Sequence, residues 1–189
     1  MPDTGELLVR HKLDVDAYHR MGEAGIFAPE DRVELIEGEV IDMPPIGLDH
    51  AASVDGLTET LVLAASGRAI VSVQNPVRLD RHNEPQPDFA VSRLRADRYR
   101  TKRAGPDDIL LLVEVSDSSL RFDRKVKLPL YARAGIAEVW IVDLQRRVVE
   151  AHRLPAGDLY AEVTSYGPGD TIALSLAPEI SVSLGQVFG

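Results

Sequence analysis

The chain contains an almost continuous apolar run, Ile109-Leu110-Leu111-Leu112-Val113-Glu114-Val115, which Glu114 alone interrupts. Such a run is typical of a central strand whose two faces are both buried. Residues 123–134 follow with helical spacing and end at Gly135, and residues 138–142 then have the pattern of the next strand. Pro129 lies inside the helical segment, where it should delay the regular part or kink it. The order of these elements predicts a single α/β domain over residues 1–189.

The segments on either side of this centre carry further local signals. Apolar spacing predicts helices over 14–24 and 50–66, with Asp49 as the cap of the second. Glu37-Gly38 lies between two apolar runs and predicts a two-residue hairpin turn. The remaining expectations are strands over 33–36, 39–43, 69–73, 76–79 and 88–92, a C-terminal antiparallel meander over 147–153, 159–165 and 170–176, and a short terminal helix over 183–188.

Composition limits the class of protein. With 189 residues, of which 44% are hydrophobic and 27% charged, the chain suits one globular domain with a sizeable core. The absence of cysteine excludes disulfides and thiolate zinc sites, and it is compatible with a reducing compartment. The apolar runs are far shorter than the roughly 20 residues of a membrane span, and no basic-then-apolar leader is present. We therefore expect a soluble, cytoplasmic protein with no membrane partner.

Charge is distributed unevenly. The net charge of −9 argues against a protein that coats nucleic acid nonspecifically, yet residues 1–50 carry −8 while residues 93–103 carry +5. The basic stretch includes Arg98, Tyr99 and Arg100, and phosphate contacts with aromatic stacking would suit a DNA strand. The alternative is a solvated loop whose charges offset the acidic N-terminal third. A polyanionic substrate is therefore not excluded.

Two carboxylates occupy positions where the sequence predicts burial. Asp88 belongs to Pro87-Asp88-Phe89-Ala90-Val91, and Glu114 lies near the end of the central run. A buried charge is costly unless a cation or hydrogen bonds compensate it. Hard cations such as Mg²⁺ or Mn²⁺ prefer oxygen ligands, which Asp88, Glu114 and the carbonyl group of Val115 would supply. The two acids therefore suggest a divalent-metal site.

Lys127 is the candidate for an activating ammonium group. In a helix that begins near Asp123, the side chains of Asp123, Lys127 and Tyr131 lie one turn apart along one face. The ammonium would then point towards the strand ends, where it would stabilise charge in a transition state. The structural alternative is that the acids are caps or ion-pair partners, and that Asp123 and Lys127 form an ordinary solvated helix pair.

Together these residues resemble the PD-(D/E)xK nuclease superfamily and, within it, the Uma-two family of restriction-endonuclease-like proteins. The matching positions extend over most of the chain: 33–39, His50, Pro87-Asp88, 113–116, Asp123, Lys127, Tyr131, Ala134-Gly135 and 138–143. The resemblance implies a restriction-endonuclease-like α/β core in which helices flank a central mixed β-sheet. It also implies Mg²⁺-dependent hydrolysis of DNA phosphodiester bonds and, often, a homodimer.

One position departs from the superfamily pattern, in which a lysine follows the glutamate by two residues. This chain has Ser116 there, so Lys127 would replace that lysine, as the Uma-two pattern suggests. Glu34, by resemblance, adds a carboxylate to the site; a strand residue paired with a base is the equal alternative. His50 is a candidate for substrate contact or a base near neutral pH, and a surface histidine beside Asp49 is its alternative.

These observations favour a Mg²⁺-dependent endodeoxyribonuclease. The competing hypothesis is a catalytically inactive nuclease-fold module that binds DNA or protein, because Ser116 supplies no positive charge. A third class, a metal phosphohydrolase of small phosphate esters, would be indifferent to changes at Arg98 and Arg100. No nucleophile elbow, phosphate-binding glycine loop or zinc-protease motif is present.

Overall fold

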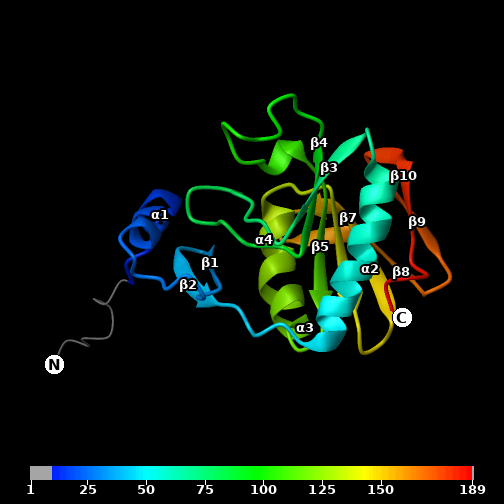
Figure 1. Cartoon of the computed structure of the whole chain (residues 1–189), viewed down its shortest axis with the longest axis horizontal. Coiled ribbons are helices and arrows are strands. Elements are labelled where there is room, and N and C mark those ends of the chain that lie inside the picture. The colour runs from blue at the N-terminus through cyan, green and yellow to red at the C-terminus, as the bar shows by residue number, and fades with distance from the viewer. Residues whose placement is uncertain (1–9, 189) are drawn as a thin grey trace.

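A six-stranded mixed sheet forms the centre of the molecule (Figure 1). The computed structural model describes residues 10–188. The strands follow the spatial order β3 (Ala69–Val73), β4 (Phe89–Arg93), β5 (Ile109–Ser116), β6 (Glu138–Asp143), β7 (Val148–Ala156) and β8 (Leu159–Tyr166). Only β5 and β6 pair in parallel, whereas the other neighbours are antiparallel. The α/β fold with a central mixed sheet is therefore confirmed.

The two central strands are buried along their whole length, as their apolar runs predict. Alternation divides their side chains between two cores. Val113 and Val115 belong to the core under α2 (Leu48–Ala65), whereas Leu112 belongs to the core on the opposite face, beneath the helical segment 120–133. Glu114 has the same parity as Leu112, so the strand directs its carboxylate towards that helical segment.

The helical segment between β5 and β6 is irregular. It comprises α3 (Leu120–Phe122), a π-helical turn over Asp123–Lys127 and α4 (Leu128–Arg133). The amide of Leu128 donates to the carbonyl oxygen of Asp123, five residues back. Pro129 follows directly and lacks an amide hydrogen, so it cannot bond one turn back. The predicted helix is confirmed, and its irregularity lies just before the proline.

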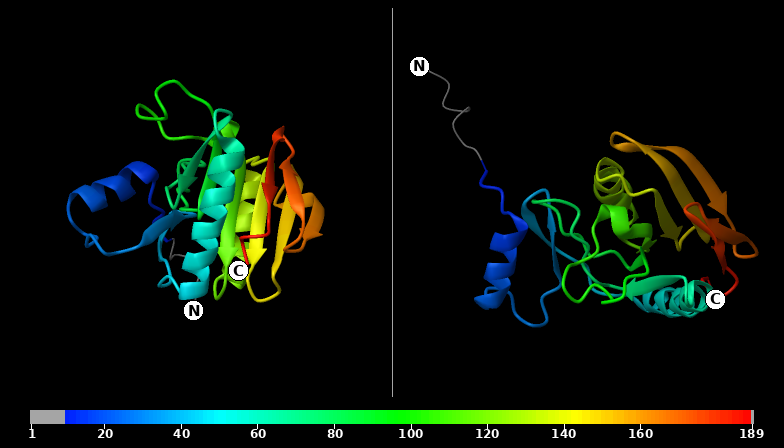
Figure 2. Two further views of the ribbon diagram at one scale, coloured as in Figure 1. Left: turned by 45° about the vertical axis from the view of Figure 1, so that its right-hand side comes forward. Right: turned by 90° about the horizontal axis from the view of Figure 1, so that it is seen from above.

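An N-terminal unit stands to one side of the sheet (Figure 2). It contains α1 (Val15–Glu23) and the hairpin of β1 (Val33–Ile36) and β2 (Glu39–Asp42). Asp14 caps α1, because its side chain accepts a hydrogen bond from the Ala17 amide at 2.7 Å. Glu37 and Gly38 have φ values of 50° and 73°. This left-handed pair is what a type I′ turn requires. The predicted helix and hairpin are both confirmed.

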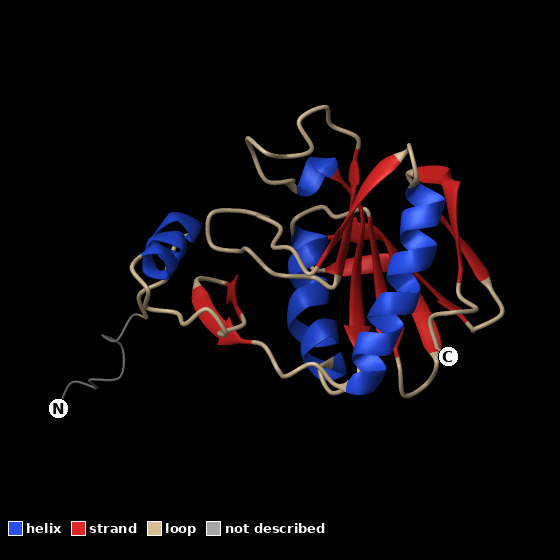
Figure 3. Ribbon diagram, in the orientation of Figure 1, coloured by secondary structure: helices blue, strands red, loops and turns tan. Residues whose placement is uncertain are grey.

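The C-terminal strands differ in their pairing from a simple meander. Residues 147–153 and 159–165 correspond to β7 and β8, which complete the central sheet. Residues 170–176 contain β9 (Thr171–Leu174), which pairs with β10 (Ala177–Ser183) in a separate two-stranded sheet. Ile172, Ile180 and Val182 are buried in the core with α2, so this small sheet covers that helix (Figure 3). The apolar alternation marked β7, β8 and β9, but it did not predict β10 and it identified no partner strands.

Three local predictions are wrong. Helix α2 begins at Leu48 and its N-cap residue is Gly47, so Asp49 is not the cap. Asp49 lies in the first turn, where its negative charge interacts favourably with the helix dipole. Residues 76–79 form no strand, because the amides of Val77 and Leu79 donate within their own loop. Residues 183–188 form no helix, because Ser183 ends β10 and a turn follows.

None of the helices within residues 10–188 is both long and apolar enough to cross a bilayer.

Candidate active site

An acidic pocket of about 330 Å³ lies where the hairpin, the start of α2, the end of β5 and the π-helical turn meet. Six acids and three bases line it. The acids are Glu34, Asp42, Asp88, Glu114, Asp117 and Asp123, and the bases are Arg32, His50 and Lys127. We call this the acidic pocket. Its excess of carboxylates makes it attractive to cations and repellent to bare phosphates.

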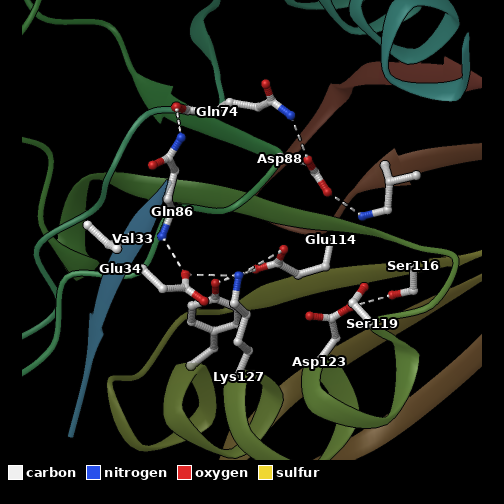
Figure 4. A network of polar contacts seen from close by, with 12 residues as sticks. Val33, Glu34, Gln74, Gln86, Asp88, Glu114, Ser116, Ser119, Asp123 and Lys127 are labelled. Carbon is white, nitrogen blue, oxygen red and sulfur yellow. Dashed lines mark hydrogen bonds and ion pairs between the residues drawn. The ribbon is translucent and has the colours of Figure 1, made fainter. Parts of the chain in front are cut away.

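An ion-pair triad forms the floor of the acidic pocket (Figure 4). The ammonium of Lys127 lies 3.0 Å from Glu34 Oε2 and 3.3 Å from Glu114 Oε1. All three side chains are buried. Burial opposes the charged form of the lysine, but the Glu114 and Glu34 carboxylates raise the pKa of Lys127 above its ordinary value. Lys127 is therefore a permanent cation in this site.

Glu114 is held from two sides. The phenol of Tyr131, one helical turn after Lys127, donates to Glu114 Oε1 at 2.5 Å. Complete burial raises the pKa of Tyr131, so the phenol keeps its proton and remains a donor. Burial also raises the pKa of Glu114, against the pull of Lys127, and the nearby acids Asp123 and Asp88 add to that rise. An added cation would relieve this accumulation of negative charge.

Asp88 lies at the entrance to β4 and is fixed by three donors. Its Oδ2 accepts the backbone amide of Val115 at 2.8 Å and lies 3.1 Å from Nε2 of His50, while Gln74 donates to Oδ1 at 3.2 Å. Burial disfavours the charge, but the hydrogen bonds from His50, Val115 and Gln74 together lower the pKa of Asp88. Asp88 is therefore an ionised carboxylate beside Glu114. The Asp88 carboxylate in turn raises the pKa of His50.

Ser116, at the position where the resemblance to PD-(D/E)xK nucleases implies a lysine, is a hydrogen-bond donor. Ser116 is fully buried and donates to Asp123 Oδ2 at 2.8 Å, and Ser119 donates to the same oxygen at 2.6 Å. Burial raises the pKa of Asp123, against these two hydroxyl groups and Lys127. Ser116 thus orients an acid instead of supplying a charge, and the only lysine that lines the pocket is Lys127.

Asp123 and Lys127, the first and last residues of the π-helical turn, both line the acidic pocket. Both are buried, whereas Lys125 between them is exposed to solvent. A π turn takes up more residues than an α turn, and such turns are frequent at functional sites. The expectation that the two side chains lie on one face is confirmed. Pro129, two residues on, accounts for the position of the irregular turn.

The structure brings together most of the predicted site residues. Six of them line the acidic pocket together with the backbone of Val115, namely Glu34, His50, Asp88, Glu114, Asp123 and Lys127, while Tyr131 reaches it through Glu114. Arg98 lines a different pocket and Arg100 lines neither. Asp88 precedes β4 and the basic stretch follows it, so this stretch leaves the sheet at the end opposite to α3 (Figure 1).

Two glutamines had not been expected at the site. The backbone amide of Gln86 donates to Glu34 Oε2 at 3.0 Å, and its side chain donates to the carbonyl oxygen of Gln74 at 2.7 Å. Gln74 has a φ of 50°, and its side chain reaches Asp88. These contacts lie in a loop of irregular backbone, where residue spacing does not predict which side chains meet. The proximity of Gln86 to Asp88 in the sequence was the one available signal.

The donor chemistry of the pocket fits a hard divalent cation. Asp88, Glu114 and the Val115 carbonyl group are oxygen donors from neighbouring strand ends, which is what Mg²⁺ or Mn²⁺ prefers. Over residues 10–188, no three histidine or acidic side chains are already clustered as a metal site. Glu114 instead contacts Lys127 and Tyr131. A bound cation would therefore have to share Glu114 with these partners.

Comparisons with known proteins identify the family and the fold. The family model Uma2, described as "Putative restriction endonuclease", matches residues 15–185. A solved structure, described as a putative nuclease belonging to DUF820 from Anabaena variabilis, is similar with a TM-score of 0.71 and 16% identity. The match covers 93% of this chain and 97% of that one, and it shows a common fold. A comparison with curated proteins finds no match.

Proposed function

The chain belongs to the Uma2 family of restriction-endonuclease-like proteins, and from this premise we propose that it is a divalent-metal-dependent endonuclease that hydrolyses DNA phosphodiester bonds. One observation carries the proposal: Asp88, Glu114 and Lys127, distant in sequence, converge on one pocket. Two acids and an ammonium group are the components that metal-assisted phosphodiester hydrolysis uses.

Asp88, Glu114 and the carbonyl group of Val115 would hold Mg²⁺ or Mn²⁺. When bound, such an ion polarises a phosphoryl oxygen and favours the deprotonation of water. The ion would also offset the acidic lining, which otherwise repels a DNA phosphate. The need for a metal therefore follows from the charge of the acidic pocket as well as from its donors.

Lys127 would stabilise negative charge that develops on the reacting phosphate. Glu34 holds the lysine at 3.0 Å, so its role is to position that ammonium. Tyr131 positions Glu114 in the same way, and His50 positions Asp88. Asp123, fixed by Ser116 and Ser119, adds a further carboxylate beside the reacting phosphate.

A DNA cleavage assay tests the proposal. Plasmid and linear duplex DNA would be incubated with Mg²⁺ or Mn²⁺ and with each of three variants, Asp88→Asn, Glu114→Gln and Lys127→Met. We expect cleavage by the wild-type protein, a loss of at least about 100-fold in each variant, and no cleavage in EDTA. Lys125→Met is the matched control, because Lys125 is exposed two residues away. Full cleavage by Lys127→Met would contradict the assigned role.

A noncatalytic DNA- or protein-binding module is the second candidate. It is favoured by one observation: Glu114 already contacts Lys127 and Tyr131. Calorimetric titration with Mn²⁺ separates the two candidates. Binding that disappears in Asp88→Ala and Glu114→Ala supports the nuclease, whereas no affinity in the wild-type protein supports the module.

We further propose a homodimer acting on DNA in the cytoplasm. The family resemblance supports the dimer, and α2 leaves Leu48, Val62 and Leu63 exposed at 90%, 48% and 69%. Val62 and Leu63 are adjacent, and contiguous exposed apolar side chains mark interfaces, whereas an isolated one such as Leu48 at the other end of α2 does not. Light scattering after size-exclusion chromatography tests the dimer, and Leu63→Glu should shift the mass to that of one chain.

A further inference from the structure

A second pocket, of about 180 Å³, lies on the sheet beside the basic stretch. The residues that give it its character are Ser72, Ser92, Arg98, Tyr99 and Arg103. We call it the basic pocket. None of its residues lines the acidic pocket. The loop between β3 and β4 lies between the two pockets and lines both. Its Asn75 lines the basic pocket, and its Gln86 lines the acidic pocket.

Both pockets open on the same face of the sheet. Ala90 and Ser92 line the basic pocket, and they pair with Ser72 and Ile70 of β3. Asp88 precedes Ala90 by two residues, so alternation places it on the same face. With a rise of about 3.3 Å per residue, the Asp88 backbone lies about 7 Å from that of Ala90 and about 13 Å from that of Ser92.

The charge of the basic pocket is available to a ligand. Arg98 is exposed and, within residues 10–188, makes no ion pair with a carboxylate. Arg103 has only a distant partner, with its Nε 3.7 Å from Glu84 Oε2. Ser72, Ser92 and Asn75 add hydroxyl and amide groups. Arginine with serine and asparagine is the donor set that proteins use for DNA phosphates.

The backbone that presents Arg98 is strained and braced. Arg98 and Tyr99 have consecutive φ values of 52° and 59°, a left-handed conformation that non-glycine residues seldom adopt. Asp97 accepts hydrogen bonds from the Tyr99 amide at 3.2 Å and from Thr101 at 2.5 Å. The Tyr99 hydroxyl donates to the carbonyl oxygen of Arg93 at 2.9 Å. Strain that surroundings maintain in this way is concentrated at ligand sites.

We propose that the basic pocket binds a backbone phosphate of the DNA substrate, one or two nucleotides from the phosphate at the acidic pocket. The interval comes from the separation of about 7 to 13 Å along β4 and the distance of about 6–7 Å between neighbouring phosphates of one DNA strand. This inference rests on the proposed function, for which it supplies the register of the substrate strand. Arg98 is the main phosphate ligand.

Binding of a fluorescent duplex DNA tests the ligand, with Ca²⁺ in place of Mg²⁺ so that a hard cation still offsets the charge of the acidic pocket, and with gel analysis to show that the DNA stays intact. Arg98→Asn is the informative variant, because asparagine tolerates positive φ and the loop should keep its shape. We expect about tenfold weaker binding, as for the loss of one charge-assisted hydrogen bond, and a slope of log affinity against log salt that is shallower by about one. Arg100→Ala, in the same loop but outside both pockets, should have a clearly smaller effect. Arg20→Ala, exposed on α1, should have none. Equal losses in Arg98→Asn and Arg100→Ala would overturn the site, because they would indicate diffuse charge.

A single uncharged methylphosphonate, moved along one DNA strand, tests the register. In the wild-type protein, binding should weaken when the substitution lies one or two nucleotides from the cut, and Arg98→Asn should lose that sensitivity. Sensitivity that remains in Arg98→Asn would overturn the inference. Normal cleavage by the wild-type protein, together with unchanged DNA binding in Arg98→Asn, would overturn only the phosphate site. DNA binding that depends on Arg98 without any cleavage defeats only the nuclease, and no DNA binding at all defeats both.

Discussion

Glu114 and Lys127 meet inside the protein, with 3.3 Å between Oε1 and Nζ and both side chains almost completely buried. One residue comes from the central strand and the other from the π-helical turn that follows it. Because Lys127 also contacts Glu34 at 3.0 Å, two buried carboxylates share a single ammonium group.

Removal of this ammonium group should destabilise the fold. Lys127→Met leaves Glu34 and Glu114 without their cation, and breaking a buried pair costs about 3–5 kcal/mol. Urea unfolding of the variant measures the loss. The double variant Lys127→Met/Glu114→Gln should be less destabilised than the sum of its single changes, because it removes an uncompensated charge. Strict additivity would show that the two groups do not interact.

Tyr131→Phe should show whether the Tyr131 hydroxyl positions Glu114, because the aromatic ring and its packing stay in place. The variant loses the hydroxyl that holds Glu114, and we expect a loss of about 1–3 kcal/mol in stability together with weaker Mn²⁺ binding. Tyr160→Phe is the matched control, since its phenol donates to the carbonyl oxygen of Ile136 at 2.8 Å and does not line the acidic pocket. It should lose stability but bind Mn²⁺ normally. Equal Mn²⁺ affinity in both variants would remove Tyr131 from the site.

Ser116→Ala should disturb Asp123. One of its two hydroxyl donors disappears, which costs about 1–3 kcal/mol for a hydrogen bond to a buried charged group. Ser118→Ala provides the comparison, because Ser118 lines the acidic pocket but is exposed. Thermal unfolding should distinguish the two variants clearly, and identical melting curves would mean that the Ser116 hydroxyl contributes nothing.

The pair of His50 and Asp88 should make stability depend on pH. The folded-state pKa of His50 is raised above 6.5, so its contribution is complete below 6.5 and is lost as the pH rises through the raised value. The folded-state pKa of Asp88 is lowered below 3.8, so its contribution is present above 3.8 and is lost as the pH falls through the lowered value. Chemical denaturation on both sides of pH 6.5 should show a decline in the wild-type protein that His50→Gln lacks. A parallel decline in His50→Gln would assign it to another group.

Two helical glycines should respond in opposite directions to alanine. A Cβ at Gly56 of α2 would lie 2.3 Å from the carbonyl oxygen of Gln186, whereas at Gly22 of α1 it would meet only Phe27 at 3.9 Å. Gly22→Ala should therefore gain up to about 1 kcal/mol of helix propensity. Gly56→Ala should lose stability, because the chain after β10 must move away from α2. Differential scanning calorimetry of both variants checks the signs.

The fold was predictable where local pattern and burial agree. The runs that became β5 and β6 were apolar because both faces are covered, and the turn was predicted because Glu37-Gly38 lies between two apolar runs. The expected strand over 76–79 failed because backbone bonding within a loop competes with sheet pairing. The pairing of β9 with β10 was also beyond local pattern, since alternation does not identify a partner strand.

The site was predictable at the positions where acids interrupt apolar runs. Asp88 and Glu114 stood out because burial of a charge needs a reason, and Lys127 followed from its helical spacing with Asp123 as well as from the family pattern. Ser119, Gln74 and Gln86 did not, because small polar side chains in loops are ordinary in any sequence. The placement of Arg98 away from the acidic pocket depended on the direction of β4, which composition does not encode.

The β1–β2 hairpin touches the rest of the fold through few backbone bonds, among them the reciprocal pair between Leu35 and Glu84. It nevertheless carries Glu34, which contacts Lys127. The acidic pocket is thus assembled from two pieces joined by the Pro44-Pro45 linker, and the ion pair of Lys127 with Glu34 requires the hairpin to dock against the rest of the fold.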